Sequence, residues 1–528
     1  MFNRFKNIIS DLKHNVSNED KMKTAKKVNI EENIKRRLKH NLKLFRSIFH
    51  DCSDVVFKEF KIGSEREINA AIIYVDGLID REIIHTEILK PLMYLTRLDE
   101  YNSTNISIEF LKNTDLAIGE IKEKKKLEEI VALILSGETA LLIDGIDKAL
   151  LLNSRGWENR QIEEPQSESV SRGPKDGFTE TLRFNTALIR RKIKHPDLKV
   201  KMMNIGERTN TDVAIVYMEE IAKKEVVEEV LSRLKTIKID GIFESGYIEE
   251  FIEDNPYSPF PQVEITERTD KASAALLEGR VAIIVDGTPV VSLVPAIMVN
   301  FYQTPEDYYE KPLFASALRL LRVLGFLVAT SLPSLYVAFL SFHFQLIPIK
   351  LVETLAEGRV KVPFPPFVEA LLMEILIDLL REANLRLPGT LGQSIGVVGA
   401  IVIGQAAVSA NLASPAMVII VSITAIGAYV IPRFSTSYSI RFLRYPMIFF
   451  AATLGIFGIA VVWLWILIHL CALESFGNPY LSPFTPLKIR DLKDTVIRAP
   501  LWAMRKRPTS PDSEDKNRQD LQKGRINK

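Results

Sequence analysis

The chain has 528 residues, a formal net charge of +2, 47% hydrophobic residues and 25% charged residues. The near-neutral total argues against a dedicated nucleic-acid-binding protein, because clustered basic charge is the usual footprint of phosphate recognition. Two cysteines, Cys52 and Cys471, make neither a disulfide framework nor a set of thiolate zinc ligands, and the seven histidines include no HExxH pair. We therefore expect no metal site and no cofactor.

The charged residues are distributed unevenly along the chain. They are sparse from 313 to 473 and far denser in the rest of the sequence. Inside the charge-poor region, the stretches 323–349, 391–432 and 445–473 contain no charged residue at all. Each stretch is longer than the roughly 20 apolar residues that cross a bilayer. The sequence therefore predicts an integral membrane protein.

The amino-terminal segment, 1–35, is polar and basic. It is rich in Lys, Asn, Glu and Asp and has no apolar period, so it is predicted to form a disordered tail. The segment also lacks the apolar core of a signal peptide. We expect the region that follows it to be cytoplasmic.

Apolar runs alternate with amphipathic stretches from about 36 to 305, a pattern typical of an α/β region. Within it, AIIYV at 71–75 recurs as AIVYM at 214–218. Likewise LSGETALLIDG at 135–145 recurs as LEGRVAIIVDG at 277–287, at nearly the same offset. Two matched segments in register predict a duplication.

The repeat divides this region into two tandem α/β subdomains, expected at 36–157 and 181–305. Each copy ends its second matched strand with an Asp-Gly pair, Asp144-Gly145 and Asp286-Gly287. Such a pair could hold a metal or a phosphate. A turn is the favoured interpretation, because glycine adopts positive φ without strain.

The segment from 158 to 180 is predicted to be a linker between the two subdomains, because it is polar and contains Pro, Ser and Gly. It is also dense in charge. This makes it the soluble segment most suited to contact a neighbouring chain, with four candidate residues: Arg160, Glu163, Glu164 and Arg172.

The charge-poor region is expected to form an α-helical membrane bundle with spans at 313–343, 391–410, 414–432 and 446–473. Pro333 lies inside the first span and is expected to kink it or to interrupt it, since proline removes a backbone hydrogen bond. Residues 392–396, GQSIG, match the G-x-S-x-G nucleophile elbow. Because they open an apolar run rather than a strand-to-helix turn, we do not expect an enzyme.

An amphipathic helix is predicted at 363–388, between the first two spans. At 100° per residue its apolar and acidic side chains fall on different faces. The apolar face holds Leu372, Ile375, Leu376 and Leu379. The acidic candidates are Glu374, Asp378 and Glu382, which are spaced four residues apart, together with Glu369. The helix could lie at the membrane interface or re-enter the membrane, or its acids could line a water-filled path, as carboxylate rings do in cation filters.

The number of membrane crossings stays open between four and five. A loop expected at 433–445 carries three arginines, and Lys488, Arg490 and Lys493 follow the last span, so the positive-inside rule draws both flanks inward. Both cannot be cytoplasmic. The basic tail from 487 to 528 is predicted to be disordered.

Several long blocks resemble the A subunit of GerA-type spore germination receptors. They include GERTNTDVAIVYM at 206–218, ERTDKASAALLEGRVAIIVDGTP at 267–289 and PFPPFVEALLMEILIDLLREANLRLP at 363–388. The likeness runs from about 40 to 485, in the order of the family and with its soluble-then-membrane layout. An accessory spore membrane protein of the SpoVA group shares many of these blocks.

The resemblance implies a multi-pass protein of the inner spore membrane that oligomerises and triggers germination. Its expected partners are a transporter-like B subunit, a C-subunit lipoprotein and membrane lipid. Two functions follow from it. One is a nutrient-gated channel for monovalent cations, and the other is a non-conducting scaffold or SpoVA-group accessory protein that passes the signal to other channels.

Overall fold

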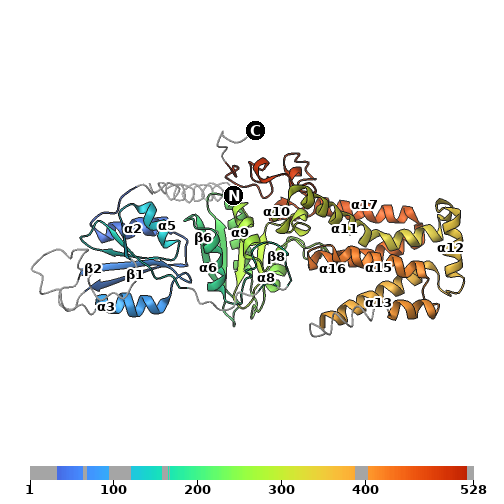
Figure 1. Cartoon of the computed structure of the whole chain (residues 1–528), viewed down its shortest axis with the longest axis horizontal. Coiled ribbons are helices and arrows are strands. Elements are labelled where there is room, and N and C mark those ends of the chain that lie inside the picture. The colour runs from blue at the N-terminus through green and yellow to red at the C-terminus, as the bar shows by residue number, and fades with distance from the viewer. Residues whose placement is uncertain are drawn as a thin grey trace, which may run out of the picture. The chain divides into compact units, whose positions relative to one another are not determined.

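The computed structural model describes residues 32–62, 68–93, 121–156, 164–165, 167–386 and 402–519. The chain divides into two compact units. The first comprises residues 1–162, 181–203 and 214–216, and the second comprises 163–180, 204–213 and 217–528. Figure 1 draws the elements of both units.

The first sheet has five strands in the order β1-β2-β4-β5-β3, and every pairing in it is antiparallel. Its strands are β1 (Val55–Ile62), β2 (Ile68–Val75), β3 (Ile121–Lys124), β4 (Thr139–Ile143) and β5 (Ala149–Leu152). Helices α2 (Leu38–Ile48) and α5 (Leu127–Ile134) lie on one face, and a π-helix (Ile83–Leu89) followed by α3 (Lys90–Met93) lies on the other.

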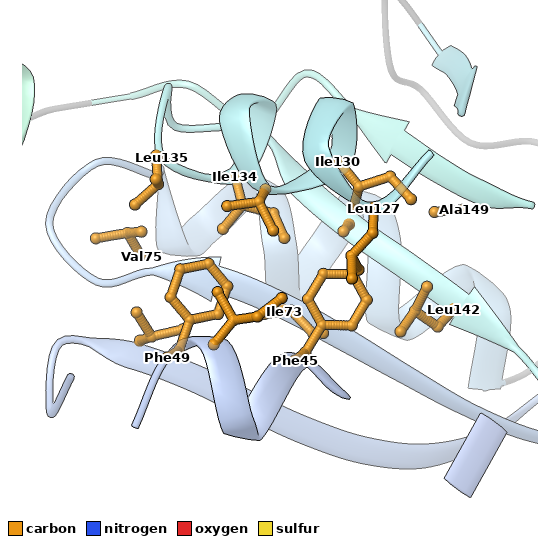
Figure 2. Close-up of a cluster of buried hydrophobic side chains, with 14 of the residues drawn as sticks. Phe45, Phe49, Ile73, Val75, Leu127, Ile130, Ile134, Leu135, Leu142 and Ala149 are labelled. Atoms are coloured by element: carbon orange, nitrogen blue, oxygen red, sulfur yellow. The ribbon is translucent and has the colours of Figure 1, made fainter. Parts of the chain in front are cut away.

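Both faces of this sheet are buried, which explains why its central strands are almost entirely apolar. On β2, Ile73 and Val75 join the core beneath α2 and α5, while Ile72 joins the core beneath the π-helix. This alternation follows from the two-residue period of a strand. Figure 2 shows Leu127 of α5 extending toward the ring of Phe45 of α2, with Ile130 in the same core.

The second sheet repeats the order of the first, as β6-β7-β9-β10-β8. Its strands are β6 (Leu198–Ile205), β7 (Thr211–Met218), β8 (Glu264–Thr266), β9 (Val281–Val285) and β10 (Val291–Val294). The helices of this part of the chain are α6 (Leu182–Lys192), α7 (Lys224–Thr236), α8 (Ser245–Ile252) and α9 (Thr269–Leu277). Equal strand order and closely matched strand lengths are what the predicted duplication requires.

The Asp-Gly pairs lie in turns. Gly145 and Gly287 have φ of +88° and +91°, a conformation that favours glycine. The Asp144 carboxylate accepts the backbone N–H of Leu38 at 2.9 Å and so satisfies a free donor at the start of α2. The turn interpretation is confirmed, and no group of metal-ligating side chains occurs among the residues that the structure describes.

The expected linker is anchored rather than loose over its described part. The Ser167 hydroxyl donates to Glu267 at 2.6 Å, and the Thr269 hydroxyl donates to Asp176 at 2.5 Å. Arg268 donates to the carbonyl of Pro174 at 2.9 Å. The polar composition of this segment thus reflects side chains that bind β8 and α9, not a lack of partners.

The helical region follows the second sheet. It contains α11 (Pro312–Ser341), α12 (Ile349–Arg359), α13 (Pro366–Arg386), α15 (Pro415–Tyr429), α16 (Phe434–Leu454) and α17 (Ile456–Ala472). Among the described residues only α11 is long and apolar enough to cross a membrane by itself, and α15 and α17 are apolar but shorter. Helices α15 and α16 both pack along α11 (Figure 1).

Two of the expected helix boundaries differ from the structure. The predicted loop at 433–445 is helical, because α16 begins at Phe434, and the predicted span at 446–473 is divided where Gly455 adopts φ of +62°. The charges in this segment do not mark a solvent loop, since Arg444 is buried against other helices. The predicted span at 391–410 lies outside the described residues up to 401.

The prediction of a disordered carboxyl tail at 487–528 is wrong for its described part, which extends to Gln519. Asp512 pairs with Lys223 at 3.4 Å, and Arg507 donates to the carbonyl of Leu277 at 2.8 Å. The tail is ordered because its charges meet specific partners, which a count of charges does not reveal. In the amino-terminal segment, residues 1–31 lie outside the description, and Ile34 is buried and bonds Lys125.

Candidate functional site

Helix α13 carries the predicted acidic candidates, but it places them differently from the expected pattern. Glu369 and Glu374 are fully buried, whereas Ile375 and Leu379 of the apolar face are 43% and 61% exposed. The first two acids therefore point into the chain. The exposed apolar side chains give α13 an outer surface suited to lipid or to a neighbouring helix.

Glu369 joins four helices. Its carboxylate pairs with Arg359 of α12 at 2.6 Å and accepts the backbone N–H and the hydroxyl of Ser414 at 2.7 and 2.6 Å. Ser414 caps the start of α15 and also bonds the Tyr336 hydroxyl of α11 at 3.0 Å. A buried carboxylate with three donors is fully compensated, so this contact fixes how the four helices pack.

Glu374 forms a buried ion pair with Arg444 of α16. The Arg444 Nε also donates to the carbonyl of Ala329 at 2.9 Å. That carbonyl lies four residues before Pro333, which has no N–H to offer it. Helix α11 continues through Pro333, so the predicted interruption is absent, and the carbonyl freed by proline is satisfied by an arginine that also neutralises an acid.

The remaining acids lie nearer the surface. Asp378 accepts the Tyr445 hydroxyl at 2.7 Å and is 3.7 Å from Arg441. Glu382 is exposed and pairs with Arg386 one turn later on the same helix at 2.7 Å. Glu374, Asp378 and Glu382 thus form a row along α13, from a buried end to an exposed end, whereas Glu369 lies about 140° around the helix from Glu374.

Some atoms of this row have no partner within the described part of the chain. They are the Glu374 Oε1 and the Arg441 Nη2, both buried. A buried polar atom without a protein partner costs free energy unless water or an ion meets it.

A second buried charge cluster connects the start of α16 to β8. Arg433 pairs with Glu168, in the segment 158–180 predicted to be a linker, and with Glu264 of β8 at 3.2 Å. Glu264 also pairs with Lys271 and Arg280. Burial alone would raise the pKa of Glu264, but the charges of Lys271 and Arg280 outweigh it and hold the pKa below its ordinary value.

A third cluster fixes the first turns of α11. Arg319 and Arg322 both pair with the buried Asp307, at 3.0 and 2.8 Å, and Arg319 also pairs with Asp494 of the carboxyl tail at 2.9 Å. Together the second and third clusters join the sheet region, the tail and the helices by buried ion pairs, which break only at a cost of several kcal/mol.

The predicted subunit-contact residues are only partly described. Arg160 and Glu163 lie outside the described residues. Glu164 pairs with Lys175 at 3.1 Å and Arg172 with Glu310 at 3.7 Å, all of them at least partly exposed. Contact with a neighbouring chain stays a prediction. The nucleophile-like motif at 392–396 also lies outside the described residues.

Sequence reasoning missed the basic partners of the α13 acids, Arg359, Arg441 and Arg444. The available signal was their position: isolated arginines between long uncharged runs must find acids if the segments pack together. From the sequence, Arg441 and Arg444 are placed in a membrane-flanking loop, because loops of membrane proteins are commonly basic, and Arg359 is assigned no role.

Comparison with known proteins decides the family. The family model described as Bacillus/Clostridium GerA spore germination protein matches residues 43–510. The chain belongs to the GerA family. The expected resemblance is thus confirmed over nearly the whole sequence.

Relatives of this GerA protein match it along most of their own length. It is 45% identical to "Uncharacterized membrane protein YfkQ" of Bacillus subtilis over 90% of this chain and 91% of the relative. It is 44% identical to "Spore germination protein KA" of the same organism, over 88% and 85%. It is 40% identical to "Spore germination protein B1", over 91% and 99%.

One solved structure also matches the GerA protein. The crystal structure of the N-terminal domain of the A subunit of the Bacillus megaterium spore germinant receptor GerK3 covers 51% of this chain and 98% of that domain. The two are 36% identical, with a TM-score of 0.41.

Proposed function

We propose that this chain is a membrane subunit of a nutrient receptor that starts endospore germination, and that several copies form a gated channel for monovalent cations. Membership of the GerA family supports the role in germination. The apolar helix α11 and a relative named a membrane protein support a location in a membrane. In our proposal this is the inner spore membrane, which the chain crosses several times with its charged sheets on the cytoplasmic side.

One observation carries the channel: a row of carboxylates crosses a region of apolar helices. Ionisable groups at membrane depth are costly and are kept where they serve an ion or proton path. Glu369 and Glu374 are closed off by Arg359 and Arg444. In our proposal this is the closed conformation of the channel. Conduction requires the two ion pairs to break or their carboxylates to change partners.

The partners in this proposal are a transporter-like B subunit, a C-subunit lipoprotein and further copies of the chain. Ile375 and Leu379 supply an exposed apolar surface on α13 for the adjoining helix of another copy. The cluster around Arg433 would carry a signal from the sheets to α16, since it binds both.

The test is ion flux through liposomes that contain the purified full chain, alone and with its two partner subunits. The channel proposal expects potassium flux above that of empty liposomes, increased by nutrient when the partners are present. A signalling scaffold, or an accessory protein of the SpoVA group, would instead leave the flux at the level of empty liposomes under every condition, and this result would refute conduction.

A further inference from the structure

A cavity of about 500 Å³ lies between the carboxyl tail and the end of the second sheet region. Residues 482–518 of the tail supply much of its wall, and Asn300 and Tyr308 also line it. All of these residues belong to the second compact unit. The acidic row and its partners do not line the cavity.

The wall of this cavity carries unmatched positive charge. Its acids already have partners: Glu278 pairs with Arg518 at 3.6 Å, and Asp494 pairs with Arg319 at 2.9 Å. The third acid, Asp491, accepts the backbone N–H of Thr509 at 2.8 Å and pairs with Arg490 at 3.5 Å. By contrast, Lys493, Arg505 and Lys506 are exposed and form no ion pair with any described residue.

Two buried hydroxyl groups on the wall also lack partners. Ser482 is fully buried and Ser510 is 6% exposed, and the Oγ of each has no hydrogen-bond partner within the described residues. Leaving such a group unpaired costs about 1–3 kcal/mol. Because these two oxygens are not accessible from the cavity, the groups that suit the oxygen atoms of a phosphate are the exposed cations.

The carboxyl tail is bonded to the first turns of α11. The Arg498 backbone N–H donates to the Ser316 hydroxyl at 3.0 Å, one turn into α11. Ser316 precedes the uncharged run that begins at Val323 by seven residues, about 10 Å of helix. For a helix that enters a bilayer there, this is the depth of the lipid headgroups.

The same part of the tail exposes apolar side chains beside the cations. Ile497, Leu501 and Trp502 are 65%, 47% and 67% exposed, and Trp502 also lines the cavity. Basic residues with adjacent apolar and Trp side chains are the composition of surfaces that bind anionic membranes. A site for a soluble anion has no need of this exposed apolar surface.

We propose that the cavity binds the phosphate headgroup of an anionic phospholipid, through Lys493, Arg505 and Lys506. The adjacent Ile497, Leu501 and Trp502 contact the upper acyl chains. The proposal rests on the membrane location stated under the proposed function, and not on ion conduction. It gives the ordered tail a role: to bind lipid beside the first turns of α11.

The test measures lipid binding by the full chain in an uncharged detergent, using native mass spectrometry. The probes are dioctanoyl phosphatidylglycerol, dioctanoyl phosphatidylcholine of equal chain length, and inorganic phosphate. We expect phosphatidylglycerol to bind at least about tenfold more tightly than phosphatidylcholine, because each basic side chain near an anionic headgroup adds to the attraction. Equal binding of the two lipids would overturn the proposal. Inorganic phosphate that displaces the lipid at equal concentration would assign the cavity to a soluble anion and would overturn the lipid assignment.

Two sets of variants separate the cavity from general charge. The triple variant Lys493→Gln, Arg505→Gln, Lys506→Gln should lose the preference for phosphatidylglycerol to within about twofold. A matched control replaces Lys224, Lys235 and Lys238, which are exposed elsewhere in the same unit, and should keep it. If both variants lose the preference for phosphatidylglycerol equally, the cavity is not the lipid-binding site.

A second variant keeps the test informative if the triple variant folds poorly. Lys493→Gln with Lys506→Gln changes only two exposed side chains, so the unfolding temperature without lipid should stay level, while phosphatidylglycerol binding weakens by about fivefold. Unchanged binding would contradict the role of the two lysines. Lipid preference without ion flux would refute only the channel, and flux without lipid preference would refute only this site.

Discussion

Arg444 donates to two groups that would otherwise lie unpaired inside the helical region, the Glu374 carboxylate and the Ala329 carbonyl. Each group would lack a partner for a local reason. The carbonyl is free because Pro333 has no N–H, and the carboxylate is buried because α13 turns its acidic side toward α16. A single arginine therefore makes a proline and an acid tolerable in an apolar setting.

Replacing this arginine should be far more costly than replacing an exposed one. Arg444→Met leaves a buried charge uncompensated and should lower the free energy of unfolding in detergent by about 3–5 kcal/mol. The double variant Arg444→Met, Glu374→Met should recover much of that loss. The control is Arg386→Met, whose exposed pair with Glu382 is worth less than about 1 kcal/mol. Equal losses for Arg444→Met and Arg386→Met would contradict the buried pair.

Glu249 of α8 should make stability depend on pH. Burial, helped by the nearby charges of Glu244 and Glu253, raises its pKa to about 7, although the Ser292 hydroxyl at 3.0 Å opposes the shift. The folded chain thus binds a proton that the unfolded chain releases near pH 4.5, so the contribution is favourable below pH 4.5 and is lost as the pH rises to 7.

The expected loss is at most about 3 kcal/mol. Unfolding temperatures of the full chain at pH 5 and pH 8 should differ less in Glu249→Gln than in the unmodified protein. Glu250→Gln, at an exposed neighbour, should keep the full difference. If Glu249→Gln also keeps it, Glu249 is not the titrating group.

At the scale of elements, α11 and α15 cross where two glycines meet. A Cβ at Gly427 would lie 3.0 Å from the carbonyl oxygen of Gly325, and a Cβ at Gly325 would lie 3.0 Å from that of Gly427. Backbone atoms move aside less easily than side-chain ends, so this close contact favours glycine at both positions. Small residues at a helix crossing allow such close approach.

Gly427→Val should therefore separate the two helices and lower the free energy of unfolding by about 1–3 kcal/mol, measured in detergent. Gly358→Ala of α12 is the matched control, because its Cβ would meet only a side-chain atom of Pro415 at 3.6 Å. That control should be neutral or stabilising, as alanine favours helix over glycine. If Gly427→Val leaves the free energy of unfolding unchanged, the two helices can move apart without cost at this crossing.

The sequence predicted the sheet elements better than the helix partners, for physical reasons. Strands such as 71–75 and 281–285 have apolar runs that the duplication presents twice, so local pattern and repeat agree. The two copies also share an ion pair with the signs reversed. Lys122 pairs with Glu138 in the first copy, and Glu264 pairs with Arg280 at the matching positions of the second copy. Such an exchange is invisible in a comparison of apolar residues.

The acidic row could be located from the sequence but not oriented. The 100° period places Glu374, Asp378 and Glu382 on one side of α13, which holds in the structure as a row. Which side faces the chain depends on Arg441 and Arg444, which lie far along the sequence. Tertiary ion pairs of this kind leave no local pattern, and neither does the binding of the tail to the sheet region.

At the scale of the whole molecule, Arg433 joins three parts of the chain: the segment before α6 through Glu168, strand β8 through Glu264, and helix α16 itself. In a receptor whose signal passes from the sheets to the helices, this cluster is a direct connection between the two. Breaking it should impair gating and leave the permeation path intact.

Arg433→Glu should abolish the increase in flux caused by nutrient, in liposomes that hold the chain with its partner subunits, because it repels both acids. The exchange variant Arg433→Glu, Glu168→Arg should restore part of that increase, since one opposite pair is re-formed. The potassium-to-chloride permeability ratio should not change in either variant. If the Arg433→Glu variant still responds normally to nutrient, the cluster around Arg433 does not transmit the signal.

The ion selectivity of the purified full chain in planar bilayers decides whether the acidic row of α13 lines a cation path. Glu374→Gln, Asp378→Asn and Glu382→Gln together should reduce the potassium-to-chloride permeability ratio by about tenfold or more, because the carboxylates that attract cations are neutralised. The control variant Glu353→Gln, Glu357→Gln, on the exposed side of α12, should keep the ratio. Selectivity unchanged in the triple variant, with current intact, would contradict the assignment of the acidic row to the cation path.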